Sequence, residues 1–377
     1  MRREHSAINM AVALLAFYAF AVAAHAQTTY KIGVMGGLSG LGAQIGQWTV
    51  EGAKVGADVV NAANGDVRIE IVAEDMQWNP QKAVQAFNKL VNVDHVAALM
   101  SGGSAAMQAI APLADQDKIV LFNIGAQAPT MAGIGQYVFS VLQLANFDVS
   151  VLADYAYTKL NLRKVALFYV SDDTGKFDQA EFERDFSKLG GTITARESFR
   201  PSETNYGAQV AKIAASRPEA IYLVGQPADL PFAVRQLRAT MPNTQILSYA
   251  GLESQEFLNA AGSAGNGIIY TTTHFDPASN DPDVKTFVDA YRKLYGKTPE
   301  SPYIGYGYDG VRILAASLAA AKQAGAKQRD VIAQTRHYPG VTGQVVFQPD
   351  GTVAKAIAVK QVKDGKFETI AVVQPPG

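Results

Sequence analysis

The chain has 377 residues, with 33 Lys and Arg against 34 Asp and Glu, and it contains no cysteine. This near-neutral balance argues against nucleic acid as a partner, because nucleic-acid binding usually needs a strongly basic face. The lack of cysteine excludes disulfides and thiolate metal sites, and the length suits two domains better than one.

The first 26 residues have the pattern of an export signal. Arg2 and Arg3 give a positive start, residues 8–22 form an apolar run, and Ala24-His25-Ala26 has the small residues that a signal peptidase needs. A membrane anchor is the alternative, but the apolar run is shorter than the roughly 20 helical residues that span a bilayer. We therefore expect residues 1–26 to be a cleaved signal peptide and the product to be periplasmic.

Strands and helices alternate along the next part of the chain. Short apolar runs predict strands at 31–35, 68–72, 96–100 and 119–122, and helical spacing predicts helices at 46–63, from Asn79-Pro80 onward, and at 105–114. After residue 150 the expected strands are 164–170, 192–197, 220–224 and 245–249, and the expected helices end at 160 or span 179–189, 207–216, 230–239 and 254–260. Such alternation predicts two parallel sheets, each with helices on both faces.

The C-terminal part has a different pattern. Expected strands at 345–347, 355–362 and 367–373 are separated by turns at Pro349-Asp350-Gly351 and Asp364-Gly365. Strands separated by such turns are typical of antiparallel hairpins.

Three strand-to-helix turns are candidates for ligand contact, because parallel sheets bind ligands where strands end. The glycine-rich turn at 36–46 lets the backbone approach a ligand, and its spacing does not give the G-x-G-x-x-G fingerprint of a dinucleotide site. Ser104 lies at the expected N-cap of a helix, where free N–H groups and its hydroxyl suit a carboxylate; the alternative is that it only caps its own helix. Gly125 and Gln127 lie in the third turn and add N–H groups and an amide.

The sequence offers little for catalysis. G-x-S-x-G does not occur, and His95, His274 and His337 are widely scattered. The acidic pairs Asp172-Asp173 and Asp281/Asp283 are better explained by solvated loops and helix starts than by general acid–base chemistry. We therefore expect no enzyme, no catalytic residue, no metal site and no cofactor.

Several short motifs occur in a specific order. They are Gly36-Gly37-Leu38-Ser39-Gly40, Glu51-Gly52-Ala53, Asp75 with Asn79-Pro80 and Ala83-Val84, Tyr308-Asp309-Gly310-Val311, and Val341-Thr342-Gly343 with Phe347 and Asp350-Gly351. Together they resemble the exported solute-binding proteins of the branched-chain amino acid (leucine/isoleucine/valine-binding) class of ABC transporters, over essentially the whole mature chain. The resemblance implies a type I periplasmic-binding fold of two doubly wound parallel-sheet lobes joined by three crossover strands.

The same resemblance implies a domain division and a partner. The expected N-terminal lobe comprises residues 27–143 and 275–346, and the C-terminal lobe comprises 144–274 and 347–377, with crossovers near 142–146, 271–275 and 345–348. The protein would be a monomer that closes on a small molecule and delivers it to an ABC permease in the inner membrane. A ligand sensor for a membrane signalling partner is an alternative that the sequence does not separate from transport.

The family resemblance also implies how the ligand carboxylate is held. Members use a serine and an Ala-x-Thr turn; Ser104 matches the serine, and Gly125 and Gln127 match the alanine and the threonine. Ser39 belongs to the first motif and is a further candidate contact.

In the second lobe the sequence departs from the family pattern. The glutamate that pairs with a ligand ammonium aligns with Ala250, a pocket tyrosine aligns with Thr174, and another pocket aromatic aligns with Gln226. Aromatic rings could come from Tyr249 and Tyr303, and also from Trp48 and Tyr206, although ordinary packing inside a lobe is the favoured alternative for each.

These changes bear on the charge of the ligand. A buried ammonium without a partner costs several kcal/mol, so we expect a carboxylate that lacks an α-amino group, such as an aromatic or aliphatic acid. Asp172, Asp173 or Glu253 could take over the missing role, which keeps a branched-chain or other amino acid open as the alternative ligand.

Overall fold

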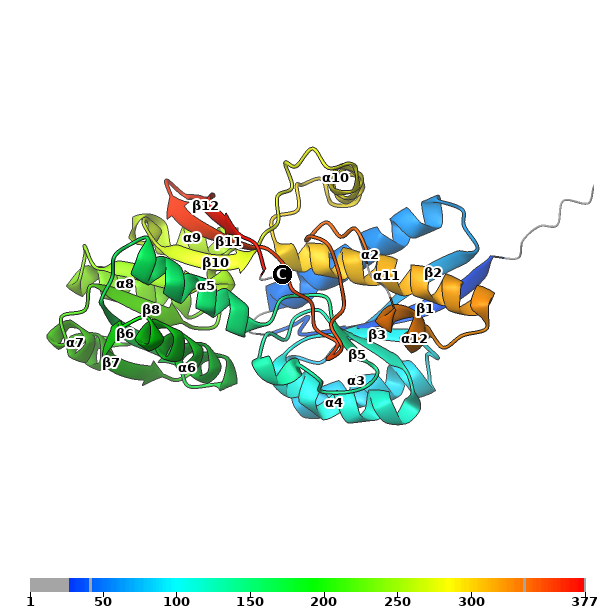
Figure 1. Cartoon of the computed structure of the whole chain (residues 1–377), viewed down its shortest axis with the longest axis horizontal. Coiled ribbons are helices and arrows are strands. Elements are labelled where there is room, and N and C mark those ends of the chain that lie inside the picture. Colours follow the sequence, from blue (N-terminus) through cyan, green and yellow to red (C-terminus); the bar gives the residue numbers. More distant parts are fainter. Residues whose placement is uncertain (1–26, 41–42, 335–336, 376–377) are drawn as a thin grey trace, which may run out of the picture.

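The computed structural model describes residues 27–40, 43–334 and 337–375, so the expected signal peptide lies outside the described residues. Two lobes lie side by side along the long axis of the molecule, each built from a twisted sheet between helices (Figure 1). The chain therefore has the expected two-lobe α/β fold. Among the described residues, no helix combines the length and the apolar character needed to cross a bilayer.

The first lobe contains a parallel five-stranded sheet in the order β2-β1-β3-β4-β5. Its strands are β1 (Thr28–Gly36), β2 (Val67–Asp75), β3 (Ala98–Ser101), β4 (Val120–Asn123) and β5 (Val138–Ser140). Its helices are α2 (Ala43–Ala62), α3 (Pro80–Asn92), α4 (Ser104–Asp117), α10 (Pro282–Tyr295), α11 (Pro302–Ala324) and α12 (Gln328–Ala333). One core cluster lies under α3 and α4 and another under α2, α10 and α11, so both faces of the sheet are buried.

The second lobe contains a seven-stranded sheet in the order β12-β11-β10-β9-β8-β6-β7. Its strands are β6 (Lys164–Val170), β7 (Thr192–Phe199), β8 (Ala220–Val224), β9 (Gln245–Tyr249), β10 (Ile269–Thr273), β11 (Ile357–Lys363) and β12 (Lys366–Val373). Its helices are α5 (Ala145–Thr158), α6 (Asp173–Lys188), α7 (Gly207–Ala215), α8 (Leu230–Thr240) and α9 (Gln255–Ala261). Strands β6 to β10 are parallel, and β11 and β12 form the expected antiparallel hairpin.

Helices α10 and α11 are absent from the expected elements. Both begin with a polar cap followed by proline: Asp281 accepts the N–H of Asp283, and Ser301 accepts the N–H of Tyr303. Each ends at a glycine in the left-handed conformation, Gly296 or Gly325. The sequence therefore contains the start and stop signals of both helices. Helix α11 nevertheless lacks the polar face that marks a surface helix, because it is buried over most of its length.

Two expected elements differ from the structure. Residues 345–347 form no strand and take part only in isolated bridges, Tyr338 with Val345 and Phe347 with Val353. Helix α6 begins at Asp173, well before the expected 179, because the side chain of Asp172 accepts the N–H of Gly175 and caps the helix.

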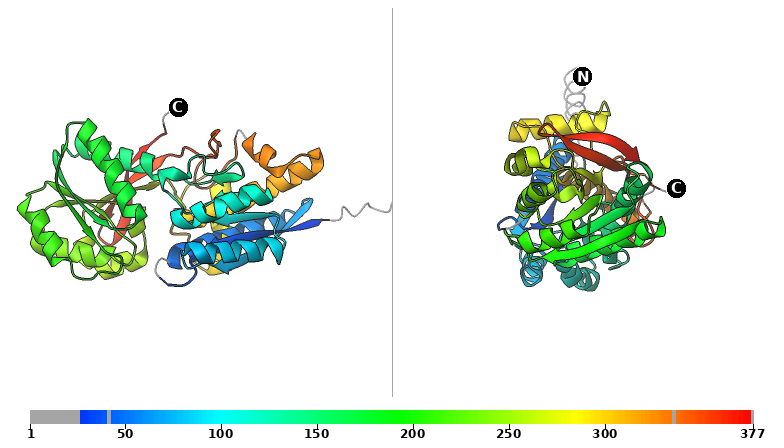
Figure 2. Two further views of the ribbon diagram at one scale, coloured as in Figure 1. Left: turned by 90° about the horizontal axis from the view of Figure 1, so that it is seen from below. Right: turned by 90° about the vertical axis from the view of Figure 1, so that its left-hand side faces the viewer.

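The described chain passes between the lobes after β5, after β10 and before β11 (Figure 2). The third passage lies later than the expected boundary at residue 346. The ring of Phe347 packs 5.8 Å from that of Phe122 and 5.3 Å from that of Phe139, and Val353 belongs to the same first-lobe core. We therefore propose lobe boundaries near residues 143, 274 and 354.

Candidate functional site

The carboxyl ends of the first-lobe strands face the second lobe. Strand β1 runs inward from the outer end of its lobe, and the other strands of this sheet are parallel to it (Figure 1). The turns after β3 and β4 carry Ser104, Gly125 and Gln127, three of the expected ligand contacts. In a parallel sheet this edge is where ligands bind.

Ser104 is the first residue of α4, and not its N-cap as the sequence suggested. The cap position is occupied by Gly103, with φ of 76° and no side-chain hydrogen bond. The Ser104 hydroxyl instead accepts the N–H of Ala128 at 3.4 Å, from the turn after β4. Ser104 therefore links the second and third turns rather than capping its own helix.

The second and third turns are in direct backbone contact. A Cβ atom added to Gly102 would lie 2.8 Å from Cα of Gly125, a distance that no side chain tolerates. The two turns thus form one continuous backbone surface with the Ser104 hydroxyl beside it, and within it the N–H groups of Gly125 and Ala126 donate to Asn123 Oδ1 at 3.2 and 2.7 Å.

Gln127 connects this surface to both lobes. Its side-chain nitrogen donates to Asp148 Oδ2 on α5 at 3.3 Å, and its oxygen accepts from the hydroxyl of Tyr303 on α11 at 3.4 Å. Since α5 belongs to the second lobe and α11 to the first, Gln127 lies where the lobes meet.

Ser39 is exposed and lies at the ends of β1 and β2. Its hydroxyl donates to Asp75 Oδ2 at 2.5 Å and accepts from Gln77 Nε2 at 3.0 Å. The hydrogen bonds of Ser39 thus join it to the end of β2 and not to the group around Ser104.

The expected second-lobe contacts come from adjacent strand ends. Thr174 lies in the first turn of α6, and Gln226 follows β8 and donates to Asp172 Oδ2 at 2.5 Å. Tyr249 ends β9 and donates its hydroxyl to the carbonyl of Gly225 at 2.7 Å, and Ala250 follows it. Since β9, β8 and β6 are neighbours in the sheet, these four residues share one edge.

The three carboxylates that could replace the missing glutamate differ in their burial and in their hydrogen-bond partners. Glu253 is buried and accepts a hydrogen bond from Lys360 Nζ, which balances its charge. Asp172 accepts from the N–H of Gly175 and from Gln226, and Asp173 is exposed.

Two acidic residues that the sequence reasoning missed lie beside this region. Asp148 on α5 and Asp178 on α6 are 6% and 4% exposed, and Asp148 Oδ1 has no hydrogen-bond partner. Burial raises the pKa of Asp148 well above its usual range, and the Asp178 charge raises it further, against the hydrogen bond from Gln127. Burial and the nearby charges of Asp172 and Glu181 raise the pKa of Asp178 to about 7. No sequence pattern distinguished these acids from solvent-facing ones.

The expected aromatic residues separate into core and site residues. Tyr206 packs 5.6 Å from Phe168 inside the second lobe and Trp48 is 4% exposed in the first-lobe core, so these two residues pack inside their lobes, which is the alternative favoured for each aromatic. Tyr249 and Tyr303 lie at the site through their hydrogen bonds to Gly225 and Gln127, and burial, with the charge of Asp178 next, raises the pKa of Tyr249.

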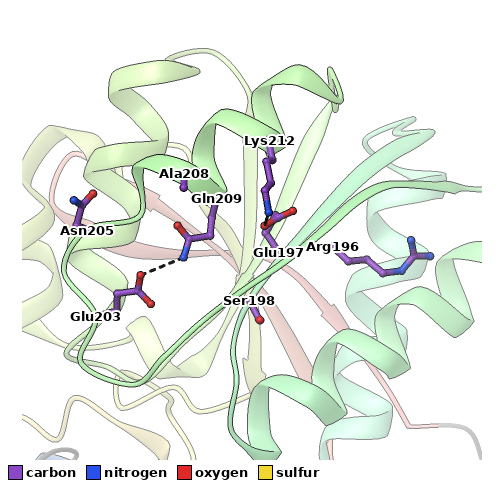
Figure 3. Close-up of a pocket in the computed structure, with 8 residues that line it drawn as sticks. All are labelled: Arg196, Glu197, Ser198, Glu203, Asn205, Ala208, Gln209 and Lys212. Carbon is purple, nitrogen blue, oxygen red and sulfur yellow. Dashed lines mark hydrogen bonds and ion pairs between the residues drawn. The ribbon is translucent and has the colours of Figure 1, made fainter.

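A separate hollow of about 620 Å³ lies on the second lobe, between β7 and α7 (Figure 3). It contains none of the expected site residues. Its charged groups are already paired, as in Lys212 with Glu197 at 3.0 Å and Gln209 with Glu203 at 3.2 Å. Within the described ranges, no group of three or more His, Asp or Glu side chains could hold a metal ion.

Comparison with known proteins gives a consistent family match. A family model described as "Periplasmic binding protein" matches residues 29–366. The chain is 26% identical to the Leu/Ile/Val-binding protein homolog 3 of Brucella melitensis, over 81% of this chain and 83% of that protein. It is 28% identical to an amino acid binding protein of Pseudomonas aeruginosa, over 78% of this chain and 79% of that protein.

Solved structures with two kinds of ligand have the same fold. The branched-chain amino acid binding protein LivJ of Streptococcus pneumoniae, in complex with isoleucine, has a TM-score of 0.85 and 27% identity, over 92% of this chain and 100% of that chain. A solute-binding protein of R. palustris in complex with benzoate has a TM-score of 0.82 and 19% identity, over 92% and 97% of the two chains. The second likeness bears on the fold alone.

Proposed function

The chain belongs to the periplasmic binding protein family, and we propose that it captures a small carboxylate without an α-amino group, an aromatic acid being favoured. It is a solute-binding protein of the ABC transporter type and not an enzyme. The permease that receives the ligand, and the removal of residues 1–26 on export to the periplasm, are part of the proposal.

One end of the site supports a carboxylate. The start of α4, at the turn after β3, presents N–H groups that have no partner within the helix, and the Ser104 hydroxyl and the Gln127 amide lie beside them. Hydrogen bonds to a charged carboxylate contribute about 1.5–3 kcal/mol each. No arginine or lysine is needed for such a receptor.

The observation that carries the proposal is that two carboxylates of the second lobe, Glu253 and Asp172, already have hydrogen-bond or ion-pair partners. By the family resemblance Ala250 aligns with an ammonium-binding glutamate, and the nearby Glu253 is already paired with Lys360. Each oxygen of Asp172 already accepts one hydrogen bond, from the N–H of Gly175 and from Gln226, which makes this carboxylate less available to an ammonium. An amino acid ligand would leave its ammonium without a partner at this end of the site.

Closure of the lobes is the mechanism we propose for capture. The contacts of Gln127 with Asp148 and Tyr303 bring side chains of both lobes to the same place. A ligand that touches both lobes binds the closed form better and therefore shifts the population toward it.

A second candidate ligand is an amino acid, and one observation favours it. Asp148 and Asp178 are both buried, Asp148 accepts from Gln127, and neither takes part in an ion pair within the described part of the chain. If both carboxyls ionised, they would offer an ammonium a strong electrostatic site, at the cost of releasing their protons.

Isothermal titration calorimetry with leucine, phenylalanine, benzoate and hydroxycinnamates tests the proposal. We expect benzoate or a hydroxycinnamate to bind and the two amino acids to bind poorly. Tight leucine binding with inert benzoate would reject the proposed ligand class and favour the second candidate.

A further inference from the structure

The turn after β2 has an unusual backbone. Gln77 and Trp78 both adopt the left-handed conformation, with φ of 48° and 52°, although neither is glycine. Such conformations cost free energy and persist only where the surroundings enforce them, often at functional sites. Two in succession make a tight turn between β2 and α3.

The indole of Trp78 lies across the ends of neighbouring strands. A Cβ atom added to Gly37, after β1, would lie 2.2 Å from Trp78 Nε1, and one added to Gly103, after β3, would lie 2.9 Å from Trp78 Cε3. Because the strand order is β2-β1-β3, the ring starts from the end of β2, covers the end of β1 and reaches the turn that leads to Ser104. Glycine at both positions leaves the room that the ring needs.

Hydrogen bonds fix the turn that carries Trp78. Asp75 Oδ1 accepts the N–H of Leu38 at 2.8 Å and that of Gln77 at 2.9 Å, and its other oxygen accepts from Ser39. The indole is only partly buried, although it packs against two backbone turns. Trp48, the tryptophan considered from the sequence as a ligand contact, lies in the core instead.

We propose that Trp78 determines specificity by providing the flat surface on which the ring of an aromatic acid lies when its carboxylate is held beside Ser104. This inference rests on the proposed function and adds the residue that would select a ring. Tryptophan suits the role because its large, rigid face gives offset or edge-to-face ring contacts and loses little conformational entropy.

The test compares benzoate binding to the full mature protein and to two variants, Trp78→Phe and Trp78→Leu. Loss of a ring contact should weaken benzoate binding about tenfold in Trp78→Leu, whereas Trp78→Phe keeps an aromatic face and should stay within about threefold of the wild type. Circular dichroism and the melting temperature establish that each variant is folded.

Fluorescence provides a second measurement that needs no change at Trp78. The chain has two tryptophans, so a Trp48→Phe protein reports on Trp78 alone. Benzoate should quench this emission with the same Kd that calorimetry gives. Unchanged emission on saturation with benzoate would overturn the inference, as would equal benzoate affinity in the wild type and in Trp78→Leu.

The two levels of the proposal fail differently. Benzoate could bind the wild type while the Trp78→Leu affinity and the Trp78 emission both stay unchanged. The indole would then cover the strand ends without touching the ligand, and only the role of Trp78 would be rejected. If the wild type binds leucine and no aromatic acid, the proposed function falls first.

Discussion

The side-chain oxygen of Gln143 accepts the backbone N–H of Lys355 at 2.8 Å, and both residues are buried. Gln143 lies in the first connection between the lobes and Lys355 in the third, so this bond ties together two segments that are far apart in the sequence. From Lys355 the network continues through Thr342 to Asp309, which also accepts the N–H groups of Val341 and Thr342. The hinge region is therefore held by buried polar groups.

Replacing Gln143 by leucine should destabilise the protein. The substitution leaves the buried N–H of Lys355 without an acceptor, which costs about 1–3 kcal/mol in the free energy of unfolding. Denaturant titration measures the change, with Gln255→Leu at an exposed position as the control, expected within about 0.5 kcal/mol of the wild type. Equal effects of the two substitutions would show that the bond does not stabilise the hinge.

Lys355 should make stability depend on alkaline pH. Burial lowers its pKa to about 8, against the charge of Asp309, whereas in the unfolded chain a lysine titrates near about 10.4. Between these values the unfolded state binds more protons, so the free energy of unfolding rises with pH from about 8 to about 10. Denaturant titrations across this range should show the rise in the wild type and not in Lys355→Met; an identical slope in both would contradict the assignment.

Asp178 should have the opposite effect at lower pH. Its pKa is raised to about 7 in the folded protein, so between about pH 4 and 7 the folded state holds a proton that the unfolded state has lost. Stability then falls as pH rises, by roughly 1.4 kcal/mol per pH unit for this group. Asp178→Asn should remove this contribution from the slope, while Glu256→Gln, at an exposed position, should retain it. A slope unaffected by Asp178→Asn would mean that this carboxyl titrates normally.

Ser104→Ala tests the carboxylate end of the site. We expect benzoate binding to weaken by one to two powers of ten, through the loss of a charged hydrogen bond of roughly 1.5–3 kcal/mol. Calorimetry measures the affinity, and Ser187→Ala, at an exposed position on α6, is the control that should bind normally. Unaltered affinity in Ser104→Ala would restrict the hydroxyl to its bond with Ala128.

The fold was largely predictable because alternating apolar strands and amphipathic helices are a strong periodic signal. The position of the third lobe boundary was not predictable from the sequence. Phe347 and Val353 pack in the first-lobe core, but they are joined only by an isolated bridge and form no strand. Sequence reasoning placed Ser104 and Gln127 on one rim since both follow strand ends. Nothing in the sequence indicated Trp78 or the buried Asp148. The contacts of Trp78 with the ends of neighbouring strands and the burial of Asp148 both depend on tertiary packing, which no local sequence pattern encodes.

The most direct measurement compares L-phenylalanine with 3-phenylpropanoate, which differ only in the α-ammonium group, by calorimetry on the same preparation. We expect 3-phenylpropanoate to bind at least about a hundredfold more tightly, because Ala250 leaves a buried ammonium unpaired at a cost of several kcal/mol. Tighter binding of phenylalanine would contradict this expectation and would assign the ammonium to Asp148 and Asp178.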